Sequence, residues 1–249
     1  MGLISKLFRR ERPNAKEHQP LSDKEAIRQF CLGIATFVKH EPPDVRAVLA
    51  LQHVLIITAC QCLEAVKEHI KFSDQKERNT KYYELASEFF GFLIHLANRR
   101  MYLDHGESIG KRWQRELVPK YIEAFISQWC KANFGGPNGP SEKNQQKLQY
   151  EEFYEEFKDR LCSELSRNVN AAEMDYAPCQ GLLAEDNKIF TGNSLFSKLA
   201  RNVTEMAGSH NPVAHAMVYF ATFEIFLKTG FTEWVNEAAR ELAAQPIAA

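Results

Sequence analysis

A few titratable side chains lie within otherwise apolar helical segments, and these are the residues of the chain best placed to do chemistry. They are His53, Glu64, His95, His215 and Glu224. Moving a charged group out of water costs several kcal/mol unless the group is paired. Burial therefore shifts the pKa of such groups, and shifted groups are candidates for acid–base catalysis or ligand contact. The sequence is compatible with a pocket lined by these five residues and with hydrogen-bonded structural roles for them.

Glu224 has the most apolar sequence neighbours of the five. Phe223, Ile225, Phe226 and Leu227 flank it directly. Burial at such a position raises the pKa of a carboxyl group unless a partner compensates for the lost water. We therefore expect a buried Glu224 with a structural partner, or a Glu224 that lines a cavity.

The residue spacings that build metal or phosphate sites are missing. None of the eight His residues belongs to a Glu-x-x-His pair, the spacing found in di-iron helical bundles. There is also no His-Glu-x-x-His, no paired Cys-x-x-Cys and no glycine-rich phosphate loop. We therefore predict no metal and no cofactor.

The cysteines are scattered along the chain. Of the six, only Cys60 and Cys62 are close in sequence. Side chains two residues apart on a helix point about 200° away from each other, so this pair forms neither a disulfide nor a chelate. The first residues also lack the apolar core of a secretory signal. These features predict a cytoplasmic protein with reduced thiols.

The overall composition is that of an ordinary globular protein, with 45% hydrophobic and 25% charged residues among 249. The formal net charge is −1. Nucleic-acid binding requires a basic surface. We therefore predict no DNA binding, and the same argument disfavours RNA.

Residues 44–72 form the segment around which the rest of the chain is predicted to pack. Between Arg46 and Glu64 lie seventeen residues without a formal charge, and Leu, Val, Ile and Ala fill nearly every side of a helical wheel. A helix that is apolar on all sides is buried on all sides. Asp44 is expected to cap its start.

Residues 212–228 show the same all-round apolar pattern. Asn211-Pro212 is a strong helix start and Gly230 a helix end. Apolar residues recur at helical spacing in most of the remaining chain. The predicted fold class is all-α: an irregular bundle of seven to nine helices around two fully buried helices. Within the segment 73–102, Gly91 is expected to let a neighbouring backbone or a ligand approach closely.

The first twelve residues, MGLISKLFRRER, have an amphipathic and basic pattern. The apolar residues of one helical face and the adjacent basic residues are Leu3, Ile4, Leu7, Phe8, Arg9 and Arg10. A short helix of this kind can lie on an anionic membrane surface. Myristoylation is not supported, because Lys6 stands where that pattern needs Ser or Thr. The alternative is a free arm, or an arm packed on its own domain.

Proline and glycine positions divide the chain into an arm and a domain. Residues 13–20 are a polar linker bounded by prolines, so residues 1–20 are predicted to be a flexible arm and linker. Residues 21–249 are predicted to be a single helical domain. The Gly/Pro-rich residues 134–141 are assigned to a surface loop, because the chain beyond them has too few elements to bury its own apolar face.

Arg100-Met-Tyr-Leu-Asp-His105 places four residues between an Arg and a His, near a predicted helix end. This spacing resembles the motif of the all-helical HEPN ribonucleases. The resemblance implies an Arg and a His that act together on an RNA phosphate and ribose without metal. The same loose spacing also occurs at Arg46 to His53 and at Arg12 to His18.

Two classes of function remain open, and the sequence does not decide whether the protein is an enzyme. The preferred one is a non-enzymatic cytosolic protein that binds another protein and reaches a membrane surface through residues 1–12. The alternative is an enzyme or small-molecule-binding protein with a pocket between the two buried helices, a HEPN-like ribonuclease included. An open pocket lined by the candidate His and Glu residues favours the alternative. A filled core with an exposed apolar patch favours protein binding.

Overall fold

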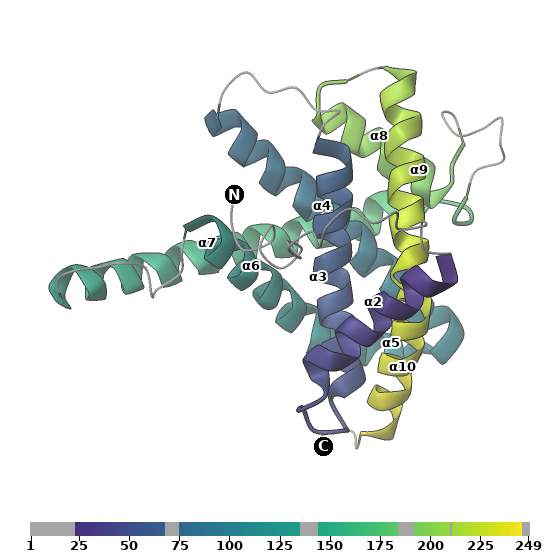
Figure 1. Ribbon diagram of the computed structural model, residues 1–249, viewed down its shortest axis with the longest axis horizontal. Helices are drawn as coiled ribbons and strands as arrows, with labels where there is room; N and C mark the ends of the chain where they lie inside the picture. The colour runs from purple at the N-terminus through teal and green to yellow at the C-terminus, as the bar shows by residue number, and fades with distance from the viewer. Residues whose placement is uncertain (1–22, 68–74, 135–143, 184–191, 210, 246–249) are drawn as a thin grey trace, which may run out of the picture.

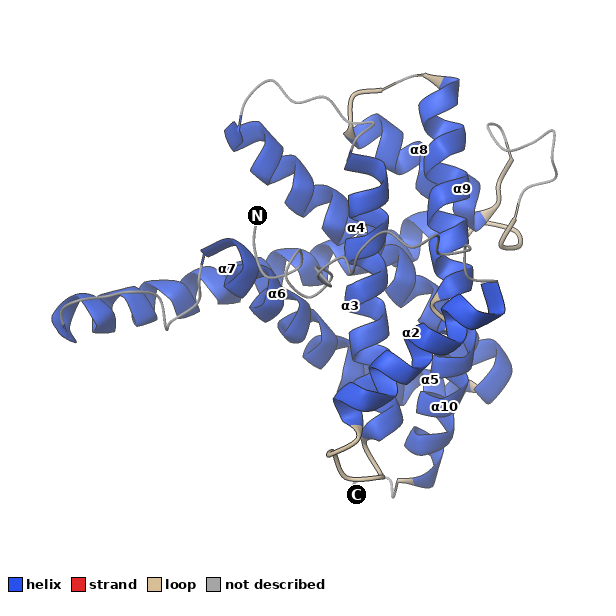
Figure 2. Ribbon diagram, viewed as in Figure 1, coloured by secondary structure: helices blue, strands red, loops and turns tan. Residues whose placement is uncertain are grey.

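Every regular element in the described part of the chain is a helix (Figure 2). The computed structural model describes residues 23–67, 75–134, 144–183, 192–209 and 211–245. The elements are α2 (Asp23–Val38), α3 (Arg46–Val66), α4 (Gln75–His105), α5 (Glu107–Arg112), the π-helical turn η2 (Trp113–Leu117), α6 (Val118–Phe134), α7 (Asn144–Tyr176), α8 (Leu195–Met206), α9 (Pro212–Lys228) and α10 (Phe231–Ala244). The predicted all-α class is confirmed.

Helix α3 is the central element of the fold, as its sequence predicts. Helices α2, α4, α9 and α10 all pack against it, and it stands in the middle of the view in Figure 1. Leu51, Val54 and Leu55 have no exposed surface. By length and composition alone α3 would also suit a membrane span. Its apolar surface is accounted for by the helices that surround it.

The start of α3 is capped from a distant part of the chain. Val45 occupies the N-cap position, and its side chain makes no capping hydrogen bond. The backbone N–H of Ala47 instead donates to Glu241 of α10, at 2.5 Å. A carboxylate suits the positive end of the helix dipole. The expectation that Asp44 caps α3 is therefore wrong, because the cap comes from α10.

Helices α4 and α7 pack closely because α4 carries a glycine at their crossing. A Cβ atom added to Gly91 would lie 3.2 Å from the Cβ of Ala172, so only a small residue fits there. The expected close approach at Gly91 is confirmed, and the approaching element is α7. Helix α7 continues past this crossing to Tyr176.

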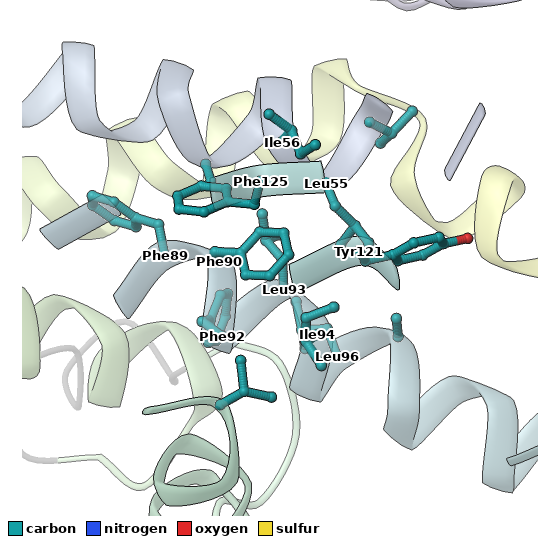
Figure 3. Packing of buried hydrophobic residues seen from close by; sticks show 14 of the residues in the cluster. Leu55, Ile56, Phe89, Phe90, Phe92, Leu93, Ile94, Leu96, Tyr121 and Phe125 are labelled. Atoms are coloured by element: carbon teal, nitrogen blue, oxygen red, sulfur yellow. The ribbon is translucent and has the colours of Figure 1, made fainter. Parts of the chain in front are cut away.

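Aromatic side chains fill the layer between α4 and its neighbours. Phe90 of α4 and Phe125 of α6 lie with ring centroids 4.5 Å apart, and Figure 3 shows them within the packed cluster. Phe92 makes edge contacts with Phe196 of α8, at 5.2 Å between centroids. Offset and edge-to-face pairs of this kind add stability beyond the area that they bury.

Helix α6 begins at Val118, so Pro119 stands in its first turn, where proline is tolerated. The chain before it stays helical through η2, where the Val118 N–H bonds to the carbonyl of Trp113. Proline has no N–H to donate and crowds the carbonyl four residues earlier. A wider π turn accommodates it. The buried Arg112 just before this turn donates to the carbonyl of Leu242, at 2.6 Å, and so ties the turn to α10.

Helix α3 is buried over most of its surface, whereas α9 is not. The ends of α9 are as predicted: Asn211 accepts a hydrogen bond from the N–H of Val213, and Gly230 follows the helix with a positive φ of 60°. Helices α2, α3 and α8 cover part of its surface. The uncovered part of α9 is apolar, and it forms the candidate site described below.

Candidate interaction surface

The five titratable residues predicted to line a pocket lie apart from one another. His53 of α3 is half-buried and stacks on Phe37 of α2, with ring centroids 5.8 Å apart. Burial lowers the pKa of His53, although the charge of Glu41 opposes the shift. Glu64 is exposed at the other end of α3 and pairs with Lys67. Neither residue lines the small cavity between α3 and α9 described below.

The other three candidates occupy separate helices or opposite sides of one helix. His95 of α4 is 4% exposed, and its Nδ1–H donates to Glu173 of α7 at 2.9 Å. His215 is buried near the start of α9. Glu224 is not buried: 63% of its side chain is exposed, and it pairs with Lys228 one turn later. The expectation of a buried Glu224 is wrong, because it lies on the side of α9 that no described helix covers.

The space between the two apolar helices is filled. A cavity between described residues of these helices has a volume of about 10 Å³ and is lined mainly by Phe and Leu. That is about the space of one water molecule, so no substrate fits. The inner positions of α9, Val218, Tyr219, Thr222 and Phe226, pack into the core. The facing sides of α3 and α9 are therefore packed as core among the described residues.

A partly buried polar cluster joins α4 to α7 and α8. The hydroxyl of Tyr176 donates to Glu88 at 2.5 Å, and the amide of Asn202 donates to the same carboxylate at 2.8 Å. Sequence patterns pointed to His95 as a candidate residue of α4. They missed Glu173, Tyr176 and Asn202, because these partners come from α7 and α8. The cluster is a set of hydrogen bonds between packed helices.

The residues of the HEPN-like spacing have separate partners. Arg100 pairs with Asp104 at 2.6 Å on the surface of α4. His105 Nε2 lies 3.1 Å from the side-chain oxygen of Asn236 in α10. Arg100 therefore contacts its own helix and His105 contacts α10, and no described contact joins the two side chains.

Gly106-Glu107-Ser108-Ile109-Gly110 has the Gly-x-Ser-x-Gly spacing of a nucleophile elbow, a pattern that the predictions above do not include. An elbow requires a strand, a sharp turn and a helix. Here Ser108 is an exposed residue of α5, which follows the long helix α4. The local fold therefore does not support a serine nucleophile.

Metal and thiol chemistry have little support in the described residues. No group of three or more His, Cys, Asp or Glu side chains there is arranged to hold a metal ion. Burial raises the pKa of the Cys60 thiol to about 12 and that of Cys130 to about 11. Thiols with such pKa values are protonated near neutral pH and are poor nucleophiles.

An exposed apolar stripe on α9 is the most unusual surface of the described structure. The stripe consists of Val213, Met217, Phe220, Glu224 and Leu227, and its four apolar residues are between 42% and 63% exposed. Along the helix these positions are separated by alternating steps of four and three residues, so they share one face. Residues of α9 alone line a shallow depression of about 490 Å³ on this face. We call this surface the α9 stripe.

Helix α2 adds two more exposed apolar residues in a neighbouring element. Leu32 is 56% exposed and Phe37 57% exposed, while Ile34 and Val38 of the same helix are buried. Helix α2 packs on both α3 and α9 and crosses them in Figure 1. Large apolar side chains are therefore uncovered on both helices of this packed pair.

The C-terminal end of the α9 stripe is acidic. Glu224 and Leu227 border a depression of about 320 Å³ at the junction of α9 with α10, which Glu233 and Lys228 also line. Lys228 forms an ion pair with Glu224. Two carboxylates and one ammonium group thus stand beside the apolar residues at this end of the stripe.

Comparisons of the chain with family models, with curated proteins and with solved structures find no match. Function is therefore inferred from the α9 stripe. Residues 1–20, which include the predicted membrane-contact residues, lie outside the described residues, so membrane contact stays a prediction. Most of the predicted loop at 134–141 also lies outside the described residues, so this loop stays a prediction as well.

Proposed function

We propose that this chain is a non-enzymatic, cytoplasmic helical protein that binds an amphipathic helix through the α9 stripe. The observation that carries the proposal is the contrast between a filled core and an uncovered apolar helix face. Apolar surface gains free energy when it leaves water, so a contiguous exposed apolar face marks a site of association.

The spacing of the stripe favours a helix as the ligand. Steps of four and three residues are those of the seam between two helices that pack side by side. Helical ligands recognised in this way present apolar residues at matching intervals to a hydrophobic surface. The stripe runs from Val213 to Leu227, a length of about 21 Å at 1.5 Å per residue. A helix of three to four turns covers it.

The acidic end of the stripe restricts the choice of ligand. Glu224 lies within the apolar row, and binding removes water from it. A carboxylate that loses water needs a cation or hydrogen-bond donors in return. We therefore expect the bound helix to carry Lys or Arg beside its apolar face.

Site-specific photo-crosslinking tests the proposal. A benzophenone amino acid replaces Phe220 in the stripe, and in a matched control it replaces Leu103, which is 72% exposed on α4. We expect the Phe220 position to give discrete protein adducts in cells that naturally express the chain, and the control position to give none of them. Identical adducts from both positions, or none from Phe220, would contradict the proposal.

A further inference from the structure

We propose that the α9 stripe binds residues 1–12 of the same chain, so that the chain's own amphipathic segment covers its partner-binding surface. This inference rests on the proposed function and names the first occupant of that site. It combines the geometry and charge of the stripe with the sequence of the segment that leads into α2.

The apolar residues of the segment have the arrangement that the stripe requires. On a helix, Leu3, Ile4, Leu7 and Phe8 occupy a single arc about 140° wide, at 100° per residue. A helix of twelve residues is about 18 Å long, which is close to the length of the stripe. The segment and the stripe therefore match in period and in length.

The charges of the two surfaces are opposite. Lys6, Arg10 and Arg12 flank the apolar arc of the segment. Glu224 and Glu233 stand at the acidic end of the stripe, beside Lys228. Cations from the segment would compensate for the loss of water around Glu224, which the apolar residues alone cannot do.

The connection between segment and stripe is long enough. Residues 13–22 separate the segment from the first residue of α2, and ten extended residues span about 33 Å. Helix α2 packs directly on α9, whose seventeen residues are about 25 Å long. The tether therefore reaches any part of the stripe.

The size of the stripe favours a tethered occupant over a second copy of the chain. Four half-exposed side chains on one helix offer on the order of a few hundred Å², whereas a stable interface buries about 800 Å² on each partner. A short linker gives an effective concentration of about 1 mM. An intrinsic dissociation constant of about 1 mM is then enough for half occupancy, and a tighter partner helix can still displace the segment.

Methyl NMR of the full chain tests this proposal. Met217 lies in the stripe and is 42% exposed, whereas Met174 of α7 is 80% exposed and serves as an internal control. With methyl-labelled Met and a soluble paramagnetic agent, relaxation enhancement reports how accessible each methyl group is. The test variant is Leu7→Asp, which breaks the apolar arc. Ala15→Asp adds the same charge within the linker and is the matched control.

We expect the enhancement at Met217 to rise about twofold or more in Leu7→Asp, with Met174 unchanged and Ala15→Asp equal to the parent. Equal enhancement at Met217 in the parent and in Leu7→Asp would overturn the proposal. If the parent, but not Leu7→Asp, then floats with anionic vesicles, the segment is a membrane contact instead.

Protection of Met217 that grows with protein concentration, together with a dimer mass by light scattering, would assign the stripe to a second copy and overturn the proposal. The Met217 experiment can fail independently of the Phe220 crosslinking experiment that tests the proposed function. Crosslinked adducts at Phe220 with an unprotected Met217 remove only the intramolecular contact. A protected Met217 without adducts removes the partner protein and leaves the intramolecular contact.

Discussion

Helices α3 and α9 are built from nearly the same kind of sequence, yet the fold uses them differently. Both read as apolar on every side and both are flanked by clear helix boundaries. Helix α3 is surrounded by α2, α4, α9 and α10, whereas the described structure covers only the inner side of α9. An apolar stripe with one glutamate therefore stays in contact with water on α9.

The difference shows what all-round apolarity means. It states that a helix gains free energy from burial on each side, but it does not state what provides that burial. For α3 the rest of the chain provides it. For α9 the described helices provide half of it, and the remainder points to an occupant that approaches from outside the packed core.

The two faces of α9 should differ most in their contribution to stability. Phe226 packs against Phe196 and Phe231, at 5.4 and 5.1 Å between ring centroids. We expect Phe226→Ala to lower the free energy of unfolding by about 3–5 kcal/mol, because it leaves a cavity. Phe220→Ala, on the exposed face, should change it by less than about 0.5 kcal/mol. Urea denaturation of both variants measures the difference, and equal losses would mean that the stripe is packed like core.

One leucine from α3 and one from α9 allow the two helices to be compared directly. Leu55 of α3 is fully buried and Leu227 of α9 is 51% exposed. Leu55→Ala should cost about 2–5 kcal/mol and Leu227→Ala less than about 0.5 kcal/mol. Thermal and chemical unfolding both measure these losses of stability. A cost above about 2 kcal/mol for Leu227→Ala would show that the stripe is already covered by stable structure.

The helix starts differ in the origin of their caps. Asn211 caps α9 from the adjacent position, with 2.9 Å between its side-chain oxygen and the N–H of Val213. Glu241 caps α3 from α10. We expect Asn211→Ala and Glu241→Ala each to cost about 0.5–2 kcal/mol in chemical denaturation. No loss in Glu241→Ala would indicate that water replaces the distant cap.

The two caps should also differ in pH dependence. Burial raises the pKa of Glu241 above 4.5, although hydrogen bonds from the N–H groups of Ala47 and Val48 oppose the shift. A raised pKa in the folded state means that the stability from this group is present below pH 4.5 and lost as the pH rises through the folded pKa.

The amide in Glu241→Gln cannot ionise. The stability of this variant relative to the parent should therefore increase as the pH rises from about 4 to 7. Asn211 has no charge to gain or lose, so Asn211→Ala should show a constant difference from the parent over the same range. Denaturation midpoints in matched buffers measure the stability of both variants relative to the parent. If the relative stability of Glu241→Gln fell as the pH rises, the pKa of Glu241 would be lowered, not raised, by folding.

Replacement of Glu224 by leucine should have the smallest effect on stability. The change removes one exposed ion pair with Lys228, a contribution of about 0.3–0.5 kcal/mol. It also makes the α9 stripe continuously apolar. We expect an unfolding midpoint close to that of the parent together with greater self-association at high concentration, measured by light scattering. A loss above about 1 kcal/mol would mean that Glu224 has a buried partner.

Local features of the fold were readable from the sequence because they depend on neighbouring residues. Asn211 and Gly230 bound α9 as predicted, and the position of Pro119 in the first turn of α6 follows from its missing N–H. The need for a small residue at Gly91 was also visible, although not the identity of Ala172 as its neighbour.

The sequence alone thus determined the all-α class, the ends of α9 and the central place of α3. Only the tertiary structure decided that Glu241 caps α3, that Glu173 pairs with His95, and that Glu224 faces water. The physical reason is the range of each interaction. Helix period and end caps act over a few residues, whereas the covered side of a helix depends on segments far along the chain that pack against it. The α9 stripe exists because the described helices cover only one side of an apolar helix.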